Sequence, residues 1–316
     1  MLVCPKRLRN QFVERLTARF AANVPDFVAL RAMVEARGGR FHNDHGAIRV
    51  ADPELAALFQ RAARVIGLRK EMDYAFPEKK LVSFDLQVVG EDASQFKIFV
   101  SQVDLDAFPP QVADLIREDN AVQAAEVDHS DFVRVIEAFE AGGCLEEGDA
   151  ERFLEHFVDV LMRRNGPPIR RSTLEAVAQV SGQVASALAL GPDLNHVTID
   201  VYAAGYRNIE EMVAEMRDRG FAMLDRIQGT EGGPLRQTAT LAATVDTAVL
   251  EDDGRVGVAR VEQQFVEIIE RNQAVCADGA RCWTQEGKPL IYRNFLAANA
   301  NRIFDAAAMG QVPIAS

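Results

Sequence analysis

One arrangement of predicted elements occurs twice in this chain of 316 residues: a strand, an amphipathic helix and two further strands. In the first copy, helical and alternating apolar periodicity predicts these elements at residues 45–50, 52–68, 79–90 and 96–105. In the second copy the same patterns predict them at residues 194–202, 208–225, 236–251 and 254–272. Two such units can share one sheet and leave a cavity between them, so the repeat constrains the fold more strongly than any single motif.

The two copies are separated by a segment of different character. Residues 109–190 are rich in Ala, Glu and Val, carry few strand signals and predict several helices. Residues 7–36 predict one or two helices, because Pro25 interrupts a helical apolar pattern. The sequence therefore predicts an α+β fold in a single domain, residues 1–316, with a first module over about 37–108, a helical insertion over about 109–190 and a second module over about 191–310.

Composition excludes several classes of function. The net charge is −12 and the pI about 5.0, so a nucleic-acid backbone would be repelled, although one or two local arginines can still bind a small anion. No apolar run reaches the roughly 18 residues of a membrane span, and the N-terminus MLVCPKRLRNQF lacks the apolar core of a signal peptide. We therefore expect a cytoplasmic protein without nucleic-acid or membrane partners.

The four cysteines are sparse, and none of them forms a Cys-x-x-Cys pair. This spacing predicts reduced thiols, and neither a disulfide framework nor a zinc ribbon. Cys276 and Cys282 are the only two that lie close together in the sequence.

The candidates for chemistry are two histidines and a group of acids on predicted strands. The chain has no Gly-x-Gly-x-x-Gly after a strand, no phosphate-binding loop with Gly-Lys-Ser/Thr, no Gly-x-Ser-x-Gly elbow and no His-Glu-x-x-His helix. His45 and His196 lie on corresponding strands of the two copies, and the last strand contains VEQQFVEIIERN. Two neutral imidazoles and one carboxylate can hold one face of an octahedral ion and leave the other face for substrate and oxygen. Because side chains alternate along a strand, only one of Glu262 and Glu267 can point at such a site.

Plainer interpretations compete with each candidate. A single histidine at the start of a strand is more often a hydrogen-bonded core or surface residue than a ligand, and this applies to His45 taken alone. His42 lies near the Arg-Gly-Gly-Arg turn and is expected to be solvated, while His129 and His156 are expected at the surface or in packing contacts. A buried glutamate on a strand is harder to explain without a metal or another cation, because an unpaired carboxylate there is costly.

Five stretches together resemble a known family: DHGAIRV, YAFPEKKL, LNHVTIDV, PLRQTAT and FVEIIERN. In their order and their placement on corresponding strands they are similar to the iron(II)-dependent 2-oxoadipate dioxygenase/decarboxylases, also called hydroxyglutarate synthases, of the vicinal oxygen chelate superfamily. The resemblance extends from about residue 10 to about residue 310 and is weak across 110–190. It implies two βαβββ modules that form one composite, partly closed and mainly antiparallel sheet.

The resemblance also implies a set of site residues. The metal ligands fall on His45, His196 and Glu267, the last because FVEIIER keeps the family's aromatic-x-Glu strand ending in an arginine. Arg49, four residues after the first histidine, falls on the arginine that binds the substrate for catalysis. Arg236 in PLRQT is either a further anion contact or an ion-paired residue at the start of a strand.

The implied activity is that of an iron(II) dioxygenase/decarboxylase. By this analogy a 2-oxo acid, 2-oxoadipate, reacts with O2 to give 2-hydroxyglutarate and CO2, and Arg49 anchors a carboxylate. Two alternatives remain: a related metal enzyme for another 2-oxo or aromatic acid, and a non-catalytic regulatory or ligand-binding protein of the same fold. The expected partners are a small 2-oxo acid and O2, and the oligomeric state stays open.

Overall fold

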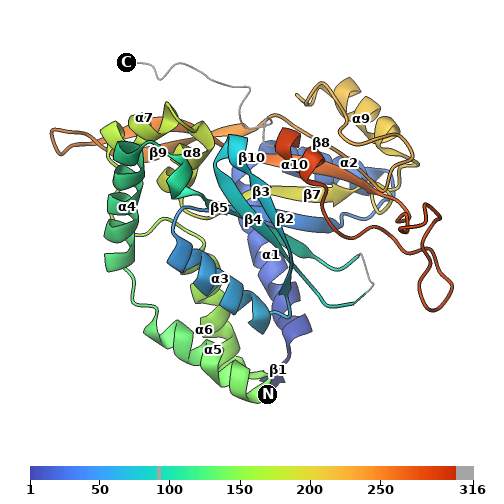
Figure 1. Ribbon diagram of the computed structural model, residues 1–316, viewed down its shortest axis with the longest axis horizontal. Helices are drawn as coiled ribbons and strands as arrows, with labels where there is room; N and C mark the ends of the chain where they lie inside the picture. Colours follow the sequence, from blue (N-terminus) through green and yellow to red (C-terminus); the bar gives the residue numbers. More distant parts are fainter. Residues whose placement is uncertain (91–93, 304–316) are drawn as a thin grey trace.

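The computed structural model describes residues 1–90 and 94–303 and shows one mixed sheet with helices on both faces (Figure 1). In this part of the chain the sheet has eight strands, in the order β3-β4-β5-β2-β7-β10-β8, with β9 paired to β10 beside this path. Their bounds are β2 Asn43–Val50, β3 Arg69–Phe76, β4 Leu81–Gln87, β5 Lys97–Val103, β7 Leu194–Asp200, β8 Leu235–Ala239, β9 Ala243–Leu250 and β10 Val256–Arg271. A separate short pairing joins β1 (Leu2–Val3) to β6 (Leu145–Glu146).

The two predicted copies meet in the middle of the sheet, where β2 pairs antiparallel with β7. In each copy the first strand also pairs in parallel with the last strand, β2 with β5 and β7 with β10, whereas β3–β4, β4–β5, β8–β10 and β9–β10 are antiparallel. Helix α10 (Ala297–Ile303) contacts both β3 and β8, the two ends of the strand order, so the sheet is curled. The predicted α+β class with a partly closed, mainly antiparallel sheet is confirmed.

Two parts of the sheet differ from the sequence prediction. The periodicity misses β3, because β3 is an edge strand whose first five residues are exposed and show no apolar alternation. The strand predicted at 236–251 is two strands, β8 and β9, which pair with different halves of β10. A bulge between Glu262 and Gln264 lies near the point where β10 changes its partner from β9 to β8. This change of partner does not alter the apolar pattern of the sequence, so the pattern does not predict it.

The helices begin at the predicted signals. The Asp52 carboxylate accepts the Glu54 backbone N–H at 2.8 Å and so caps α3, and Pro25 separates α1 from α2. A π-helical turn, His156–Leu161, continues α6. The helix bounds are α1 Pro5–Asn23, α2 Pro25–Ala36, α3 Pro53–Val65, α4 Pro110–Ala125, α5 Ser130–Gly142, α6 Glu147–Glu155, α7 Arg171–Ala178, α8 Gly182–Leu190 and α9 Ile209–Asp218.

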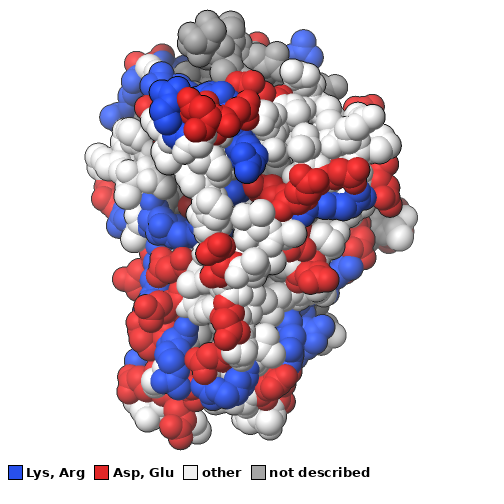
Figure 2. Space-filling model, turned by 90° about the vertical axis from the view of Figure 1, so that its left-hand side faces the viewer, with Lys and Arg blue, Asp and Glu red and all other residues white. Residues whose placement is uncertain are grey.

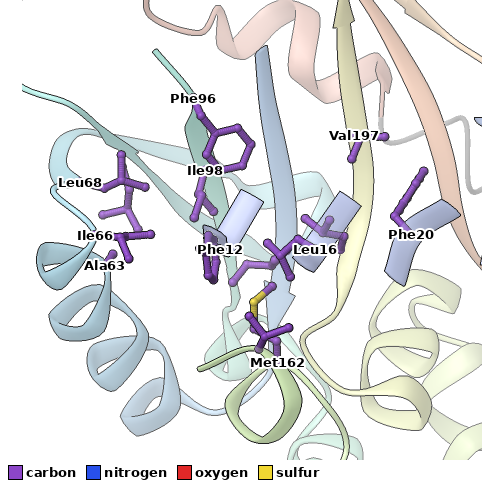
Figure 3. Packing of buried hydrophobic residues seen from close by; sticks show 14 of the residues in the cluster. Phe12, Leu16, Phe20, Ala63, Ile66, Leu68, Phe96, Ile98, Met162 and Val197 are labelled. Carbon is purple, nitrogen blue, oxygen red and sulfur yellow. The ribbon is translucent and has the colours of Figure 1, made fainter. Parts of the chain in front are cut away.

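Apolar side chains are buried on both faces of the sheet. The larger cluster joins one face to α1, α2, α3, α5, α6 and α9. Figure 3 shows Phe12, Leu16 and Phe20 along α1, packed with strand residues that include Ile98 and Val197. A second cluster on the opposite face lies beneath α4, α7 and α8. The sheet is therefore a central layer covered on both sides.

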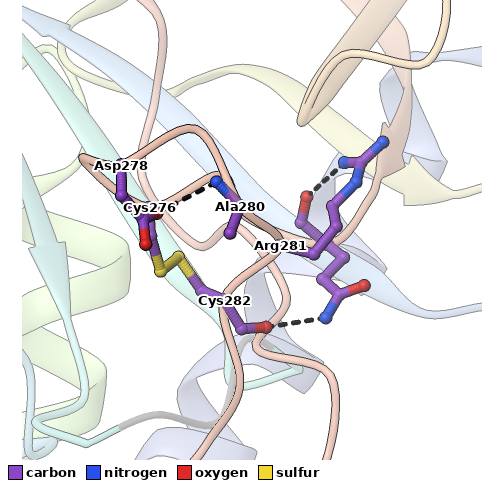
Figure 4. Close-up of a disulfide and its surroundings, with 6 residues drawn as sticks. Cys276, Asp278, Ala280, Arg281 and Cys282 are labelled. Carbon is purple, nitrogen blue, oxygen red and sulfur yellow. Dashed lines mark hydrogen bonds between the residues drawn. A yellow bond between two sulfur atoms is a disulfide. The ribbon is translucent and has the colours of Figure 1, made fainter.

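The prediction of reduced thiols is wrong for Cys276 and Cys282, which form a disulfide (Figure 4). Their Cα atoms lie 5.3 Å apart because the loop turns back at Gly279, whose φ of 84° favours glycine. Sequence spacing alone does not show that this loop turns back on itself. Cys4 and Cys144 are free thiols, as predicted, and their Sγ atoms are 2.8 Å apart.

No helix in the described residues is long and apolar enough to cross a membrane. On the face shown in Figure 2, acidic and basic side chains are interleaved rather than gathered by sign. Such a face presents no broad basic field to a nucleic-acid backbone, in keeping with the net charge of −12.

Replacing Phe12 by Ala should lower the free energy of unfolding by roughly 3–5 kcal/mol, because loss of a buried ring leaves a cavity. Phe12 is 0% exposed and stacks on Phe157 with ring centroids 4.7 Å apart. Urea unfolding followed by circular dichroism measures the loss. The matched control is Val28→Ala on α2, where the side chain is exposed and a change within about 0.5 kcal/mol is expected. Equal stability of Phe12→Ala and the parent chain would contradict the role of Phe12 in the core.

His129 and His156 pack against each other in the helical segment between the two copies. Nδ1 of His129 lies 2.8 Å from Nε2 of His156, and the His156 ring stacks on Phe132. Both histidines are half-buried, so the expectation of packing contacts is confirmed. Burial, together with the neighbouring His129, lowers the pKa of His156 to about 4.

This lowered pKa makes stability depend on pH. A histidine whose pKa is lower in the folded chain than in the unfolded chain favours folding while it is neutral. Its contribution is therefore full above the unfolded pKa of about 6.5 and is lost as the pH falls toward the folded value of about 4. His156→Gln should flatten this part of the pH profile, measured as the urea midpoint at about pH 7.5, 6 and 5. An unchanged slope in the variant would show that another group causes the loss.

Candidate metal centre

Three adjacent strands bring His45, His196 and Glu267 together. One ligand atom from each residue lies within 4.8 Å of the others. His45 Nε2 is 3.5 Å and His196 Nε2 is 3.1 Å from Glu267 Oε2. All three side chains are buried. They come from β2, β7 and β10, which are far apart in the sequence. We call these residues the His-His-Glu cluster.

The unpartnered atoms of this cluster fit a metal ion. Nε2 of His196 and Oε1 of Glu267 are buried and have no hydrogen-bond partner among the described residues. Leaving such a polar atom unsatisfied costs about 1–3 kcal/mol, and a bound cation would remove that cost. Two imidazole nitrogens and one carboxylate oxygen are a donor set for non-haem iron(II) and for other divalent transition metals.

Each histidine is oriented by the residue that precedes it. Nδ1 of His45 lies 2.8 Å from Asp44 Oδ2, and Nδ1 of His196 lies 3.1 Å from Asn195 Oδ1. An ionised carboxylate can only accept, so Asp44 takes the Nδ1–H of His45, and Nε2, 3.1 Å from Thr198 Oγ1, is the ring nitrogen that faces Glu267. The Asn195 carbonyl fixes His196 in the same tautomer when it accepts from Nδ1.

Asp44 is a buried carboxylate held by two cations. Arg271 donates from Nε to Oδ1 and from Nη2 to Oδ2, both at 2.8 Å, and Lys97 Nζ lies 3.3 Å from Oδ1. Burial alone would raise the pKa of Asp44, but the charges of Arg271 and Lys97 and the hydrogen bond from His45 hold it well below its usual range. Asp44 is therefore ionised and remains an acceptor for His45.

The cluster itself carries an ionised glutamate. Burial alone would raise the pKa of Glu267, but His45 and His196 lower it to about 2. Burial alone would lower the pKa of His45, but the carboxylates of Glu267 and Asp44 raise it. Because metal ligands must be deprotonated, the proton that these carboxylates favour on His45 competes with a metal ion, whereas Glu267 offers a charged carboxylate.

An aromatic wall covers the first-module side of the cluster. The Phe295 ring meets the His45 ring edge to face with centroids 4.8 Å apart. Phe295 also contacts Phe99 and Tyr74, at centroid distances of 5.0 and 6.4 Å. These rings make that side of the site largely aromatic.

Arg49 lies on β2 beyond the cluster. It is 6% exposed, and its Nη2 donates to the Gln183 side-chain oxygen at 3.0 Å. Burial lowers the pKa of Arg49 to about 10, so the guanidinium is charged at neutral pH. Ser186, Asn195 and Glu262 are among the residues that line a pocket beside it. A buried guanidinium facing a polar pocket can pair with a carboxylate through two hydrogen bonds.

Arg236 does not join the His-His-Glu cluster. Its guanidinium pairs with Glu210 and lies 3.6 Å from Glu270. Arg236 and Glu270 are cross-strand partners of β8 and β10, so alternation turns both away from the face that carries Glu267. These contacts match the ion-pair alternative for Arg236.

The expectation of a solvated His42 is wrong, and Glu262 stays outside the cluster for a reason that simple alternation does not give. His42 is half-buried rather than solvated, and its Nε2 is buried. Glu262 does not follow the simple alternation, because the bulge before Gln264 interrupts it and Glu262 lines the pocket beside Arg49. Glu262 is nevertheless outside the His-His-Glu cluster.

The sequence prediction misses Asp44, Arg271 and Phe295. Asp44 and Arg271 lie inside the stretches DHGAIRV and FVEIIERN, and a charged residue within an otherwise apolar strand is the signal that could have found them. Lys97, in the strand FKIFV, carries the same signal. Phe295 carries none, since phenylalanine is expected in any core.

A match to a family model decides what kind of protein this is. The model of the 2-oxoadipate dioxygenase/decarboxylases matches residues 12–286. The chain belongs to the 2-oxoadipate dioxygenase/decarboxylase family. The 2-oxoadipate dioxygenase/decarboxylase of Mycobacterium tuberculosis (strain ATCC 25618 / H37Rv) is 24% identical over 367 aligned positions, which cover 94% of this chain and 86% of that protein. Membership of the 2-oxoadipate dioxygenase/decarboxylase family makes the chain an enzyme of the oxidoreductase class.

Solved structures share the fold. A glyoxalase superfamily protein from Ralstonia eutropha JMP134 has a TM-score of 0.75 at 21% identity, over 86% of this chain and 85% of that chain. Hydroxyglutarate synthase from Oryza sativa, solved in complex with 2-oxoadipate, has a TM-score of 0.70 at 18% identity, over 97% and 94%. The enzyme from Pseudomonas putida, also with 2-oxoadipate, has a TM-score of 0.70 at 22% identity, over 88% and 67%. The fold implied by the sequence resemblance is confirmed for this member of the 2-oxoadipate dioxygenase/decarboxylase family.

Glu267→Gln should weaken binding of a divalent metal by at least about 100-fold, because loss of a ligand exceeds the 10- to 100-fold effect of losing an outer partner. The amide keeps the size of the side chain and removes its charge. Calorimetric titration with Mn(II) measures the affinity. Glu262→Gln makes the same chemical change on the same strand outside the cluster and should bind Mn(II) like the parent chain. Equal affinities of the two variants would argue against Glu267 as a ligand.

Proposed function

We propose that this chain is an iron(II)-dependent dioxygenase/decarboxylase whose substrate is a 2-oxo acid, 2-oxoadipate. In this reaction 2-oxoadipate and O2 give 2-hydroxyglutarate and CO2, which balances without a further reductant. The observation that supports it is the buried His-His-Glu cluster, in which Nε2 of His196 and Oε1 of Glu267 have no hydrogen-bond partner among the described residues. Family membership and the 2-oxoadipate complexes of two proteins with this fold support the choice of substrate.

In the proposal His45 and His196 hold the ion through Nε2, and Glu267 holds it through a carboxylate oxygen. Iron(II) bound there supplies open positions for a chelating 2-oxo acid and for O2. Asp44 and Asn195 keep both imidazoles in the tautomer that presents Nε2.

Arg49 positions the substrate in this proposal. His45 and Arg49 are four residues apart, about 13 Å of extended strand, and even spacing turns both to the same face. An arginine side chain and a six-carbon acid can bridge this span together. One end of the acid then reaches the cluster while a carboxylate pairs with the guanidinium.

The aromatic wall excludes water in the proposal. Phe295 contacts both Phe99 and Tyr74, so three aromatic rings lie together on this side of the site. A dry site strengthens the pairing of Arg49 with a carboxylate and protects reactive species from water.

A second candidate substrate class is a 2-oxo acid without a second carboxylate. Glu262 and Asp193 line the pocket beside Arg49. A glutamate in this position can compete with a distal carboxylate for the guanidinium. Oxygen uptake across linear, branched and aromatic 2-oxo acids separates the two substrate classes.

The iron-loaded enzyme should consume O2 with 2-oxoadipate and form 2-hydroxyglutarate and CO2 in equal amounts. Arg49→Gln should lower kcat/KM by about 10- to 100-fold, because a charged pair with the substrate is lost, while metal content stays the same. An oxygen electrode measures O2 uptake, mass spectrometry measures the 2-hydroxyglutarate formed, and metal analysis measures the bound iron.

The matched control is Arg61→Gln, which removes an arginine paired with Glu140 on helices away from the site. Its kcat/KM should equal that of the parent enzyme. If the metal-loaded chain consumes no O2 with any 2-oxo acid, the proposal is wrong and a ligand-binding role is favoured.

A further inference from the structure

The three cluster residues are closed off from solvent. His45, His196 and Glu267 are at most 4% exposed. A metal ion and a substrate can therefore reach them only when a covering element moves. The candidates are the elements that lie over the cluster without being strands of the sheet.

Helices α4, α7 and α8 also lie on this face, but the element that contacts His45 is residues 291–303, which we call the C-terminal strap. Its helix, α10, contacts β8 and β3 at opposite ends of the strand order (Figure 1). Asn299 Nδ2 donates to the Leu235 carbonyl at 3.2 Å, and Ile303 packs with Ala239 and Phe265. The strap also carries Phe295, the ring that lies on His45. It therefore spans the opening of the curled sheet.

One arginine connects this strap to the ligand histidine. Arg271 binds the Asp44 carboxylate through Nε and Nη2, and Asp44 accepts from His45. Its remaining terminal nitrogen, Nη1, donates to the carbonyls of Tyr292 and Asn294 at 3.1 and 3.0 Å. Arg271 thus holds both the residue that orients His45 and the segment that covers it.

The guanidinium also stabilises the cover directly. Its central carbon lies 5.4 Å from the centroid of the Phe295 ring, within the range of a cation–π contact. Phe295 in turn contacts His45. The contacts from Arg271 to His45 therefore form a closed loop, through Asp44 on one side and through Phe295 on the other.

We propose that Arg271 and Asp44 are positioning residues that couple metal binding at His45 to closure of the C-terminal strap. This rests on the proposed function only in taking the His-His-Glu cluster as a metal centre. Coordination at Nε2 of His45 holds the ring with its Nδ1–H directed at Asp44, which fixes the carboxylate that aligns Arg271. An aligned Arg271 keeps Nη1 directed at the strap carbonyls. By linkage, strap closure strengthens metal binding by the same factor.

A purely structural role does not explain why charges occupy this place. Asp44, Arg271 and Lys97 are at most 3% exposed. Buried ion pairs of this kind are often replaceable by apolar groups without loss of stability. Apolar groups could not fix the tautomer of His45, nor satisfy the strap carbonyls.

The test uses Mn(II) as the metal and the variant Arg271→Lys, which keeps the charge and loses the planar set of donors. In the parent chain, Mn(II) should slow backbone hydrogen exchange across residues 291–299. In Arg271→Lys, Mn(II) affinity should fall about 10- to 100-fold and the slowing should disappear. Asp44→Asn should give the same losses, and the double variant should lose little more, because both residues serve one interaction.

The matched control is Arg164→Lys in the helical insertion. Arg164 binds Asp119 through both terminal nitrogens at 2.7 and 2.8 Å and donates to the carbonyls of Pro167 and Leu188. It therefore copies the bonding of Arg271 at a place without metal ligands. Arg164→Lys should lower the thermal stability. It should leave unchanged both the Mn(II) affinity and the slowing of hydrogen exchange by Mn(II) across residues 291–299.

The outcomes separate this inference from the proposed function. If Arg271→Lys binds Mn(II) as tightly as Arg164→Lys, or if Mn(II) leaves exchange of the parent strap unchanged, the coupling is wrong even when the enzyme oxidises 2-oxoadipate. If the coupling is observed and no 2-oxo acid is oxidised, only the proposed function fails. If the parent chain binds no Mn(II), both fail. If Arg271→Lys does not fold, exchange in the parent chain compared with Asp44→Asn still tests the coupling.

Discussion

The antiparallel pairing of β2 with β7 is the contact on which the rest of the molecule depends. It joins the two modules in one sheet and sets Ala47 opposite His196. β7 then pairs with β10 in a register that sets Glu267 beside Thr198. Positions two residues apart share a face of a sheet, so two adjoining registers are enough to gather all the ligands. A slip of one residue in either register would turn a ligand to the opposite face.

Buried charge is tolerated around the cluster because each charged group has an opposite neighbour. Asp44 lies between Arg271 and Lys97, and Glu267 lies against the two imidazoles. The pairing keeps both carboxylates ionised in a place where burial alone would neutralise them. The outer carboxylate, Asp44, then orients the ring of His45, while the inner one, Glu267, contacts both imidazoles. The site thus uses the same chemical group for two tasks in adjacent layers.

Much of the fold and the central cluster could be predicted from the sequence, because the strands that carry His45 and His196 have clear apolar patterns. The choice of Glu267 came from resemblance, since periodicity alone left Glu262 open and the bulge in β10 breaks the alternation there. The network around Asp44 could not be predicted, because Arg271 reaches it only through pairing between strands far apart in the chain. The exposed edge strand β3 and the Cys276–Cys282 disulfide could not be predicted either, because neither leaves a periodic signal in the sequence.

The two modules contribute unequally. In the first module, Phe99 pairs with Ala47, which lies two residues after His45. In the second module, Glu267 pairs with Thr198, which lies two residues after His196. Phe99 and Glu267 therefore occupy corresponding places in the two modules. The first module alone therefore offers a single imidazole and an aromatic ring where the second offers an imidazole and a carboxylate. During synthesis the first module emerges with half of a site, and the long helical insertion follows before any partner appears. Only when β10 joins the sheet do His45, His196 and Glu267 come together, so a metal ion held by all three would be bound late in the maturation of the chain.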